Sequence, residues 1–247
     1  MTTGRGRTGD GEAPVALRVL LVEDDPVIGE ATAAHLERDG YEVVRLGDGL
    51  EAWDRWREAD PPFDLVVSDV VLPGLDGATL TRRIRGVDQV PVVLVSARTD
   101  ALDVVGGLEA GADDYVTKPF DVQVLLARLR NALRRTTAAP GAVTDTDPGP
   151  AGEGETWGDL TLDRRALRVL RGGEPVRLTP TELRLLLELA DEAGHVVSRR
   201  TLLERVWGYG DAEDDDHLVN VHVQRLRAKV GAERVETVRG FGYRLVP

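Results

Sequence analysis

The chain lacks cysteine entirely and has few aromatic residues. Without cysteine it can form no disulfide, no thiolate metal site and no cysteine nucleophile. Aromatic residues make up 4% of its 247 residues, yet 42% are hydrophobic, which is enough for buried cores. We find no apolar run of about 18 residues, so no membrane span is predicted, and the polar N-terminus shows no secretory signal pattern. We therefore expect a cytoplasmic protein without a membrane partner.

Lysine is scarce as well: Lys118 and Lys229 are the only two lysines among 31 basic residues. Lys118 stands in the stretch YVTKPF, directly before a proline. A lysine ammonium is a compact point charge, whereas an arginine guanidinium is a planar fork. In a chain that otherwise uses arginine, we treat Lys118 as a candidate functional residue.

The net charge of −12 is distributed unevenly. Residues 156–247 carry equal numbers of acidic and basic side chains, so the excess of acid lies before them. Between the two parts, TTAAPGAVTDTDPGPAGEGE has the Pro, Gly and polar composition of a flexible linker and no periodicity. We predict a disordered tail, a first domain, a flexible linker and a second domain, at residues 1–15, 16–135, 136–155 and 156–247.

The first domain alternates short apolar runs with helical patterns. Apolar runs occur at 17–22, 41–46, 63–68, 90–96 and 114–117. Helical patterns occur at 26–39, 49–58, 77–85, 100–109 and 120–134. Continuous apolar strands between helices predict a parallel sheet covered on both faces. The expected fold class is α/β, with a five-stranded, doubly wound, flavodoxin-like sheet whose ligands bind at the carboxyl ends of the strands.

Polar side chains gather at those carboxyl ends. They are, in chain order, Glu23, Asp24, Asp25, Asp69, Ser96 and Lys118. Crowded carboxylates repel one another unless a cation joins them, and hard oxygen ligands suit Mg²⁺. An aspartate at such a site can attack a phosphoryl group, while Mg²⁺ and a lysine neutralise its oxygens. The alternative is a set of helix caps beside a buried Lys–Asp ion pair.

Four stretches, LLVEDD, VSDVVLPGLDG, LVSAR and GLEAGADDYVTKPF, resemble the receiver domain of two-component response regulators over about residues 17–135. The resemblance implies a CheY-like fold and a phosphoacceptor, Asp69, that a sensor histidine kinase phosphorylates. It implies that Ser96 and Lys118 bind the phosphoryl oxygens and that the Lys118–Pro119 peptide bond is cis. The implied Mg²⁺ ligands are the side chains of Asp24, Asp25 and Asp69 and the backbone carbonyl of Val71.

The resemblance also implies a homodimer that forms on phosphorylation. Ser96 would move toward the phosphate and Tyr115 would rotate into the space it leaves. The face made by the fourth helix, fifth strand and fifth helix would then dimerise, with Asp114 and Arg128 as a usual ion pair.

At a second usual ion pair of that face the chain departs from the family. Val104 and Val124 stand where many members carry a basic residue and a glutamate. Because an exposed ion pair contributes only ~0–1 kcal/mol, an apolar contact between these valines need not weaken the dimer. We expect it to reduce the salt dependence of dimerisation.

The second domain begins with short strands, continues with helical patterns near 180–192, 198–206 and 216–230, and ends in a hairpin at 234–246. This order predicts a winged helix. In the last helix a core stripe falls on one face, made of Val219, Val223, Leu226 and Val230. The opposite face carries His217, Val221, Gln224, Arg225 and Ala228. Such a face suits the DNA major groove, where arginine reads guanine and glutamine reads adenine; a plain amphipathic surface helix is the alternative.

The hairpin ETVRGFGYRL favours DNA binding because its Gly-flanked tip presents Arg239, which can enter a narrow minor groove. Together with RLTPTELRLLLELA, VVSRRTLLERVWG and VNVHVQRLRAKV, it is similar to the OmpR/PhoB-type winged-helix effector over about residues 157–247. The resemblance implies base contacts by Val221, Gln224 and Arg225. It implies backbone contacts by Trp207, His222, Arg227 and Tyr243.

In this family the loop before the last helix faces RNA polymerase, and here that loop is the acidic stretch GYGDAEDDD at 208–216. Members commonly bind promoter DNA as direct repeats, although the receiver dimer is two-fold. A 20-residue linker has a reach of ~25 Å. Two such linkers therefore span half-sites that lie about 34–36 Å apart.

Two other function classes stay open. A DNA-binding protein controlled without phosphate would have no need for the intact set Asp24, Asp25, Asp69, Ser96 and Lys118. An aspartyl-phosphate phosphatase would need a general acid two residues after its nucleophile, and Val71 stands there. We therefore expect a phosphorylation-activated transcription factor rather than an enzyme.

Overall fold

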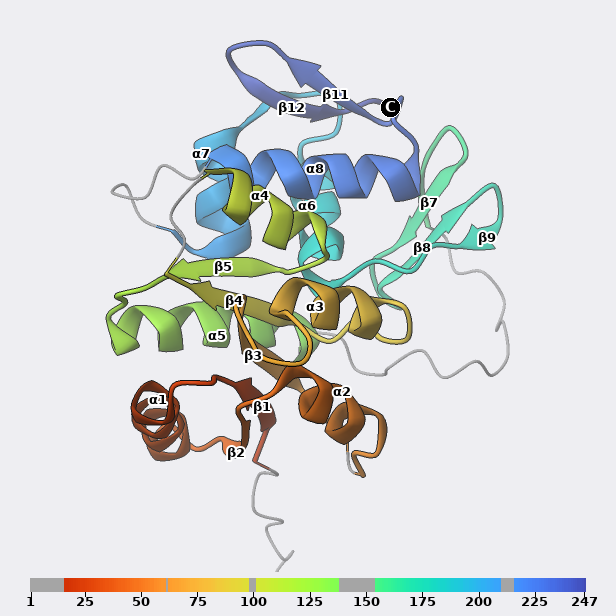
Figure 1. Ribbon diagram of the computed structural model, residues 1–247. Helices are drawn as coiled ribbons and strands as arrows, with labels where there is room; N and C mark the ends of the chain where they lie inside the picture. The colour runs from red at the N-terminus through yellow and green to blue at the C-terminus, as the bar shows by residue number, and fades with distance from the viewer. Residues whose placement is uncertain (1–15, 61, 98–100, 138–153, 210–215) are drawn as a thin grey trace, which may run out of the picture.

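The computed structural model describes residues 16–60, 62–97, 101–137, 154–209 and 216–247. They form an α/β domain followed by a winged-helix domain, which pack against each other (Figure 1). The predicted tail at 1–15 and most of the predicted linker lie outside the described residues.

The first domain contains the predicted five-stranded sheet, with every strand pair parallel and the order β2-β1-β3-β4-β5. Its strands are β1 (Arg18–Val22), β2 (Glu42–Leu46), β3 (Leu65–Asp69), β4 (Val92–Ser96) and β5 (Asp114–Thr117). Its helices are α1 (Pro26–Arg38), α2 (Gly49–Arg57), α3 (Gly77–Arg85), α4 (Ala101–Glu109) and α5 (Val122–Thr137).

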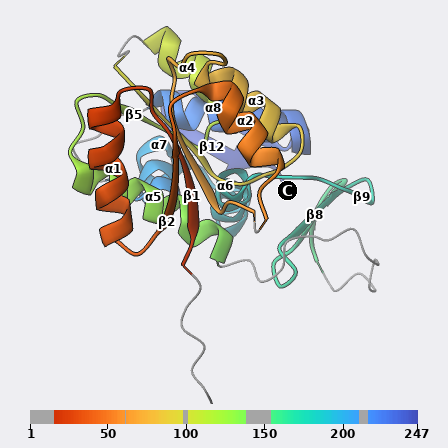
Figure 2. The same ribbon diagram turned by 60° about the horizontal axis from the view of Figure 1, so that its bottom comes forward.

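Helices cover both faces of this sheet because the side chains of each strand alternate between the two faces. In β1, Val19 and Leu21 share a buried cluster with α1 and α5. Leu20 and Val22 point the other way, into a cluster with α2 and α3. Figure 2 shows α1 and α5 on one side of β1 and β2, and α2 and α3 on the other.

Short polar signals start the helices at the carboxyl edge of the sheet. Asp25, Asp48 and Asp76 accept hydrogen bonds from the first backbone N–H groups of α1, α2 and α3, which otherwise lack partners. Gly77 opens α3 so close to β3 that a Cβ would lie 2.1 Å from the Asp69 carbonyl oxygen. The end of β3 is therefore enclosed tightly by the next helix.

The second domain has the expected winged-helix order. A four-stranded antiparallel sheet comes first, with β6 (Glu155–Trp157), β7 (Leu160–Asp163), β8 (Arg168–Arg171) and β9 (Glu174–Pro175). The helical part contains α6 (Pro180–Asp191), α7 (Arg199–Leu202), the π-helical turn η1 (Leu203–Trp207) and α8 (Asp216–Val230). The wing sheet contains β10 (Val197–Ser198), β11 (Val235–Val238) and β12 (Gly242–Leu245).

The structure shortens the predicted linker at both ends. Helix α5 continues through Thr137 and strand β6 begins at Glu155, so part of the predicted 136–155 segment is helix and strand. Residues 138–153 lie outside the described chain. Among the described helices, none is long and apolar enough to cross a membrane.

A single buried cluster connects the two domains. It contains Leu94, Leu108 and Tyr115 of the first domain together with the core of the second, including Trp207 and Val221. Figure 1 shows α4 lying beside α8. The helix predicted to read DNA therefore packs against the first domain.

Candidate functional site

Lys118 connects two acidic residues at the carboxyl edge of the parallel sheet. Its Nζ donates to Asp69 Oδ2 and to Glu23 Oε2, both at 2.6 Å. Asp69 ends β3, Glu23 follows β1 and Lys118 follows β5. Burial lowers the pKa of Lys118, but the hydrogen bonds and charges of the two carboxylates outweigh it, so the pKa lies above its usual value. Lys118 therefore stays a cation beside the predicted phosphoacceptor.

Three carboxylates at this edge lie close enough to hold one metal ion. Oxygen atoms of Glu23, Asp24 and Asp69 all lie within 4.8 Å of one another. Glu23 Oε1 is buried and has no hydrogen-bond partner among the described residues. Burial raises the pKa of Glu23 above its usual value, and Lys118 offsets part of that rise. A hard divalent cation fits this set because it would satisfy the buried oxygen and offset the repulsion.

The predicted ligand Asp25 needs correction. Its Oδ1 accepts hydrogen bonds from Val27 N at 2.8 Å and Ile28 N at 3.1 Å, so it caps helix α1. Glu23 takes its place in the carboxylate cluster. The sequence contained the signal, because an aspartate directly before a proline at the first helical position is typical of an N-cap.

Val71 and Ser96 also lie next to the site. Val71 N donates to Asp69 Oδ1 at 2.9 Å, so both oxygens of the Asp69 carboxylate are held. Ser96 is fully buried at the end of β4, and its carbonyl accepts from Lys118 N at 2.7 Å. The Lys118–Pro119 peptide bond is cis, as predicted. The roles of Ser96 and of the Val71 carbonyl stay predictions.

Part of the predicted dimer face contacts the second domain. Within the chain, Arg128 lies 3.2 Å from Asp114, and the role of the two residues in a dimer stays a prediction. The hydroxyl of Tyr209, from the second domain, donates to Asp114, and Arg128 donates to that hydroxyl. Tyr115 is buried in the cluster that connects the domains.

The two predicted dimer valines differ in their surroundings. Val104 of α4 is partly buried against the cluster that connects the domains. Val124 of α5 is 39% exposed. One chain cannot show a contact between protomers, so their pairing stays a prediction.

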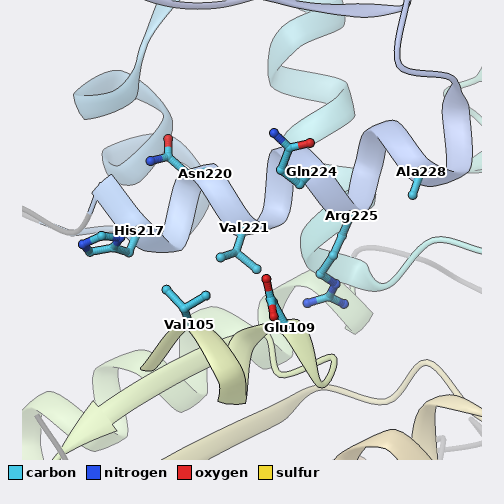
Figure 3. A pocket seen from close by; sticks show the side chains of 8 residues that line it. All are labelled: Val105, Glu109, His217, Asn220, Val221, Gln224, Arg225 and Ala228. Atoms are coloured by element: carbon cyan, nitrogen blue, oxygen red, sulfur yellow. The ribbon is translucent and has the colours of Figure 1, made fainter. Parts of the chain in front are cut away.

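Helix α8 has the predicted core stripe and, opposite it, the predicted reading face. Val219, Val223, Leu226 and Val230 are fully buried. On the other face, α8 and α4 line an open groove of about 440 Å³. Its lining contains the five residues of the predicted reading face with Asn220, and, from α4, Val105 and Glu109 (Figure 3). The predicted reading face is thus turned toward α4.

Three of the predicted DNA contacts are engaged with the first domain or buried beside it. Arg225 Nη1 donates to the carbonyl of Ala112 at 2.8 Å. Trp207 is fully buried, and its indole nitrogen donates to the Asp113 carbonyl at 3.1 Å. His222 is fully buried with its ring centroid 5.1 Å from that of Trp207.

The remaining candidates lie on the wing side of α8. Arg227 donates to the Val235 carbonyl and to Thr237 Oγ1, both at 2.7 Å. The hydroxyl of Tyr243 donates to Asn220 Oδ1 at 2.5 Å. Arg239 is exposed at the wing tip, where Figure 1 shows the β11–β12 hairpin projecting from the molecule. The acidic loop at 210–215 lies outside the described residues.

Sequence reasoning missed several residues that the structure brings to these sites. Arg199 donates to Asn220 at 3.1 Å beside the wing. Asn131 Nδ2 donates to the Trp207 carbonyl at 2.7 Å. Tyr209 reaches Arg128 and Asp114 across 81 and 95 sequence positions. No local sequence pattern predicts contacts between residues so far apart in the chain.

The chain matches two family models. Residues 19–130 match the response regulator receiver domain. Residues 173–245 match the family described as transcriptional regulatory protein, C terminal. One match falls in each domain of the structure, and the second begins after strand β8.

Similar proteins match nearly the whole chain. The transcriptional regulatory protein CseB of Streptomyces coelicolor is 56% identical over 229 residues, which cover 92% of this chain and 97% of CseB. The DNA-binding response regulator MtrA of Mycolicibacterium smegmatis is 43% identical, with 93% of this chain and 97% of MtrA covered. A solved structure of a RitR mutant, 24% identical, has a TM-score of 0.68 and covers 93% of this chain and 99% of that chain, which shows a shared fold.

Proposed function

We propose that Asp69 is the phosphoacceptor of this chain, which belongs to the OmpR/PhoB-type response regulators, the transcription regulators of two-component systems. The observation that carries the proposal is the contact of Lys118 with both Asp69 and Glu23 at 2.6 Å. A fixed cation beside a carboxylate nucleophile, with two further acids, is the arrangement that phosphoryl transfer to aspartate needs.

In the proposed reaction, a carboxylate oxygen of Asp69 attacks the phosphorus of a phosphohistidine on the sensor kinase. A P–O bond forms, the P–N bond breaks, and the histidine nitrogen keeps the electron pair. Lys118 stabilises the charge on a phosphoryl oxygen, and the Ser96 hydroxyl donates to another. Mg²⁺ held by Glu23, Asp24 and Asp69, with the Val71 carbonyl as a further ligand, would supply additional charge neutralisation.

The experiment for this site is phosphate-affinity electrophoresis with a small phosphodonor and Mg²⁺. Wild type should acquire a retarded band, and Asp69→Asn should not. Asp25→Asn is the matched control, because it alters the α1 cap and leaves the proposed ligands in place, so it should still be phosphorylated. A retarded band in Asp69→Asn at the wild-type level would overturn the assignment.

As the response to phosphorylation, α8 and the wing would bind promoter DNA. The protein would act in the cytoplasm, where that DNA lies. Val221, Gln224 and Arg225 would face the bases, and Arg239 would enter the minor groove. Trp207, His222, Arg227 and Tyr243 would contact the backbone. A phosphorylated homodimer would place two such domains on direct repeats, within reach of RNA polymerase.

Mapping the bound DNA and then measuring Kd for two variants tests this output. Gln224→Ala should change the preference at one base pair, because a base contact carries sequence information. Arg239→Ala should weaken binding and reduce the preference for a narrow minor groove. Arg168→Ala, an exposed arginine on β8, is the control and should bind as wild type does.

A second role as a phosphatase for other molecules has no acid to support it, because Val71 occupies the position two residues after Asp69. We propose regulation rather than turnover. Steady release of phosphate from an added phosphoester, in amounts above the protein concentration, would contradict this.

A further inference from the structure

We propose that Phe241, at the tip of the wing, is an apolar wedge that enters the minor groove beside Arg239 and partly unstacks one base step of the DNA. The inference rests on the proposed function, since it takes the wing as the part of the chain that meets the minor groove. It adds to that function a residue that sets both the affinity and the sequence preference of the wing.

Phe241 differs in its surroundings from the other two phenylalanines of the chain. Phe63 is 4% exposed and stacks on Trp56, and Phe120 packs against the buried cluster of α1 and α5. Phe241 is 72% exposed, and it is the only aromatic residue among the exposed large hydrophobic residues of the described chain. A single exposed apolar side chain is common on protein surfaces, so the place of Phe241 in the fold decides what its exposure means.

A tight turn places Phe241 next to the proposed minor-groove arginine. Phe241 N donates to the Val238 carbonyl at 3.0 Å, which closes a four-residue turn with Arg239 and Gly240 at its centre. Gly240 has a φ of 79°, the left-handed value that the third position of a type II turn requires. Arg239 and Phe241 therefore stand on either side of this glycine, and both are exposed at the end of a hairpin that projects from the molecule (Figure 1).

The residue after Phe241 is held from both sides. Gly242 pairs with Val238 of β11 and with Ser198 of β10. A Cβ on Gly242 would lie 2.0 Å from the Val197 carbonyl oxygen, so β10 and β12 approach each other as only glycine allows. Because its neighbour is fixed in this way, Phe241 has little backbone freedom to lose when it binds, which favours affinity.

The base of the wing carries cations that would bring this tip to DNA. The guanidinium carbons of Arg199 and Arg227 lie 4.9 and 5.7 Å from the ring centroid of Tyr243. Both arginines donate to carbonyl, amide and hydroxyl oxygens. None of these acceptors is a carboxylate, so the two charges stay available for phosphates. The one acid of the hairpin, Glu236, is paired with Arg244 and therefore repels the DNA backbone less.

An arginine and an apolar ring act differently in a minor groove. Arginine favours the narrow, electronegative groove of A·T-rich segments. An inserted phenylalanine instead separates two base pairs and kinks the duplex toward the major groove. Pyrimidine–purine steps such as TA and CA unstack most readily. With Arg239 and Phe241 side by side, the wing should prefer a flexible step at the edge of an A·T-rich segment.

Full-length protein and DNA targets that carry 2-aminopurine test the wedge, because the fluorescence of this adenine analogue rises when it unstacks. After the bound DNA has been mapped, the analogue is placed in turn at each step of the minor groove under the wing. Wild type should raise the fluorescence at one step and bind a TA step there more tightly than an AA step. Phe241→Ala should lose the rise and the step preference, and its Kd should increase about 10-fold, the order of a single base–aromatic contact.

Two further variants serve as controls. Phe241→Leu keeps an apolar wedge and should retain part of the fluorescence rise. Val87→Ala removes an apolar side chain that is 65% exposed in the first domain and should behave as wild type does. A wild-type Kd and fluorescence rise in Phe241→Ala would overturn the wedge. So would a loss of affinity confined to targets with two half-sites, because it would place Phe241 against a neighbouring protomer.

A failure of the proposed function would look different from a failure of the wedge. If wild type preferred no DNA sequence, DNA reading by α8 and the wing would be refuted and the wedge with it. If Arg239→Ala kept the wild-type Kd while Phe241→Ala lost affinity and the fluorescence rise, the wedge would stand and the minor-groove role of Arg239 would fall.

Discussion

Tyr209 of the winged-helix domain donates its hydroxyl proton to Asp114 of strand β5, 95 positions earlier in the chain. The same hydroxyl accepts a hydrogen bond from Arg128, so one tyrosine engages both members of the predicted dimer ion pair. The contact converts a face expected to meet a second protomer into a face that holds the DNA-binding domain.

Lys118→Arg should still fold and still be phosphorylated, yet fail to dimerise on phosphorylation. Arginine keeps the charge, but its planar fork cannot place one compact charge on one phosphoryl oxygen as the ammonium does. The measurement is the dimer fraction by light scattering at matched phosphorylation levels. The control is Lys229→Arg, because Lys229 is the only other lysine and pairs with Glu182, away from the predicted phosphoacceptor. This variant should dimerise normally. Normal switching in Lys118→Arg would mean that charge alone suffices.

Asp113→Asn should destabilise the protein by about 3–5 kcal/mol at pH 7, because it leaves the buried Arg85 without its charged partner. Asp113 is fully buried and its Oδ2 lies 2.5 Å from Arg85 Nη2. Burial works to raise the pKa of Asp113, but Arg85 and Arg225 hold it below the ordinary value of 3.8.

The sign of this shift sets the pH window. A depressed pKa contributes stability that is present above the unfolded-state pKa and is lost as the pH falls through the folded-state pKa. The difference between wild type and Asp113→Asn should therefore persist down to about pH 4 and shrink below it, as measured by urea unfolding. Asp54→Asn, in the exposed Arg57 pair, should show no such pH-dependent loss, and a pH-independent loss in Asp113→Asn would contradict the assignment.

Val124→Glu should make the phosphorylated dimer weaker and more sensitive to salt. In the proposed dimer, the substitution would place a carboxylate opposite Val104 of the partner protomer, where no basic residue stands to pair with it. The measurement is the dimer Kd by analytical ultracentrifugation at several salt concentrations. Gln123→Glu adds the same charge at the neighbouring exposed position and controls for net charge. If the Kd and its salt slope stayed at wild-type values, the valine contact would be ruled out.

Glu213→Ser combined with Asp214→Ser should abolish activation of transcription and leave DNA binding intact, if the acidic loop meets RNA polymerase. Both positions lie outside the described residues, so the expectation comes from their charge and their place before α8. In vitro transcription and a DNA-binding assay on the same preparation separate the two effects. Glu233→Ser, at an exposed acid after α8, is the control. Wild-type transcription from the double variant would remove the loop from the contact.

Much of the geometry of the proposed phosphoacceptor site could be predicted, because parallel strands bring their carboxyl ends to one edge of the sheet. Asp69, Ser96 and Lys118 meet there for that reason. The choice between Glu23 and Asp25 was harder, because three acidic residues follow one another at positions 23–25. Position along the chain separates the two roles. Asp25 directly precedes α1, so its side chain reaches the free N–H groups of that helix and caps it.

By itself, the sequence determined the two folds, the parallel five-stranded sheet, the core stripe of α8 and the motif of the predicted phosphoacceptor. It could do so because periodicity, capping and turn chemistry act between near neighbours in the chain. Only the tertiary structure decided that Arg225, Trp207 and Tyr209 engage the first domain. Docking depends on the shape and charge of two finished surfaces. The free energy of docking is a small difference between the gain from burying apolar surface and the cost in conformational entropy. No pattern along one strand or helix predicts that difference.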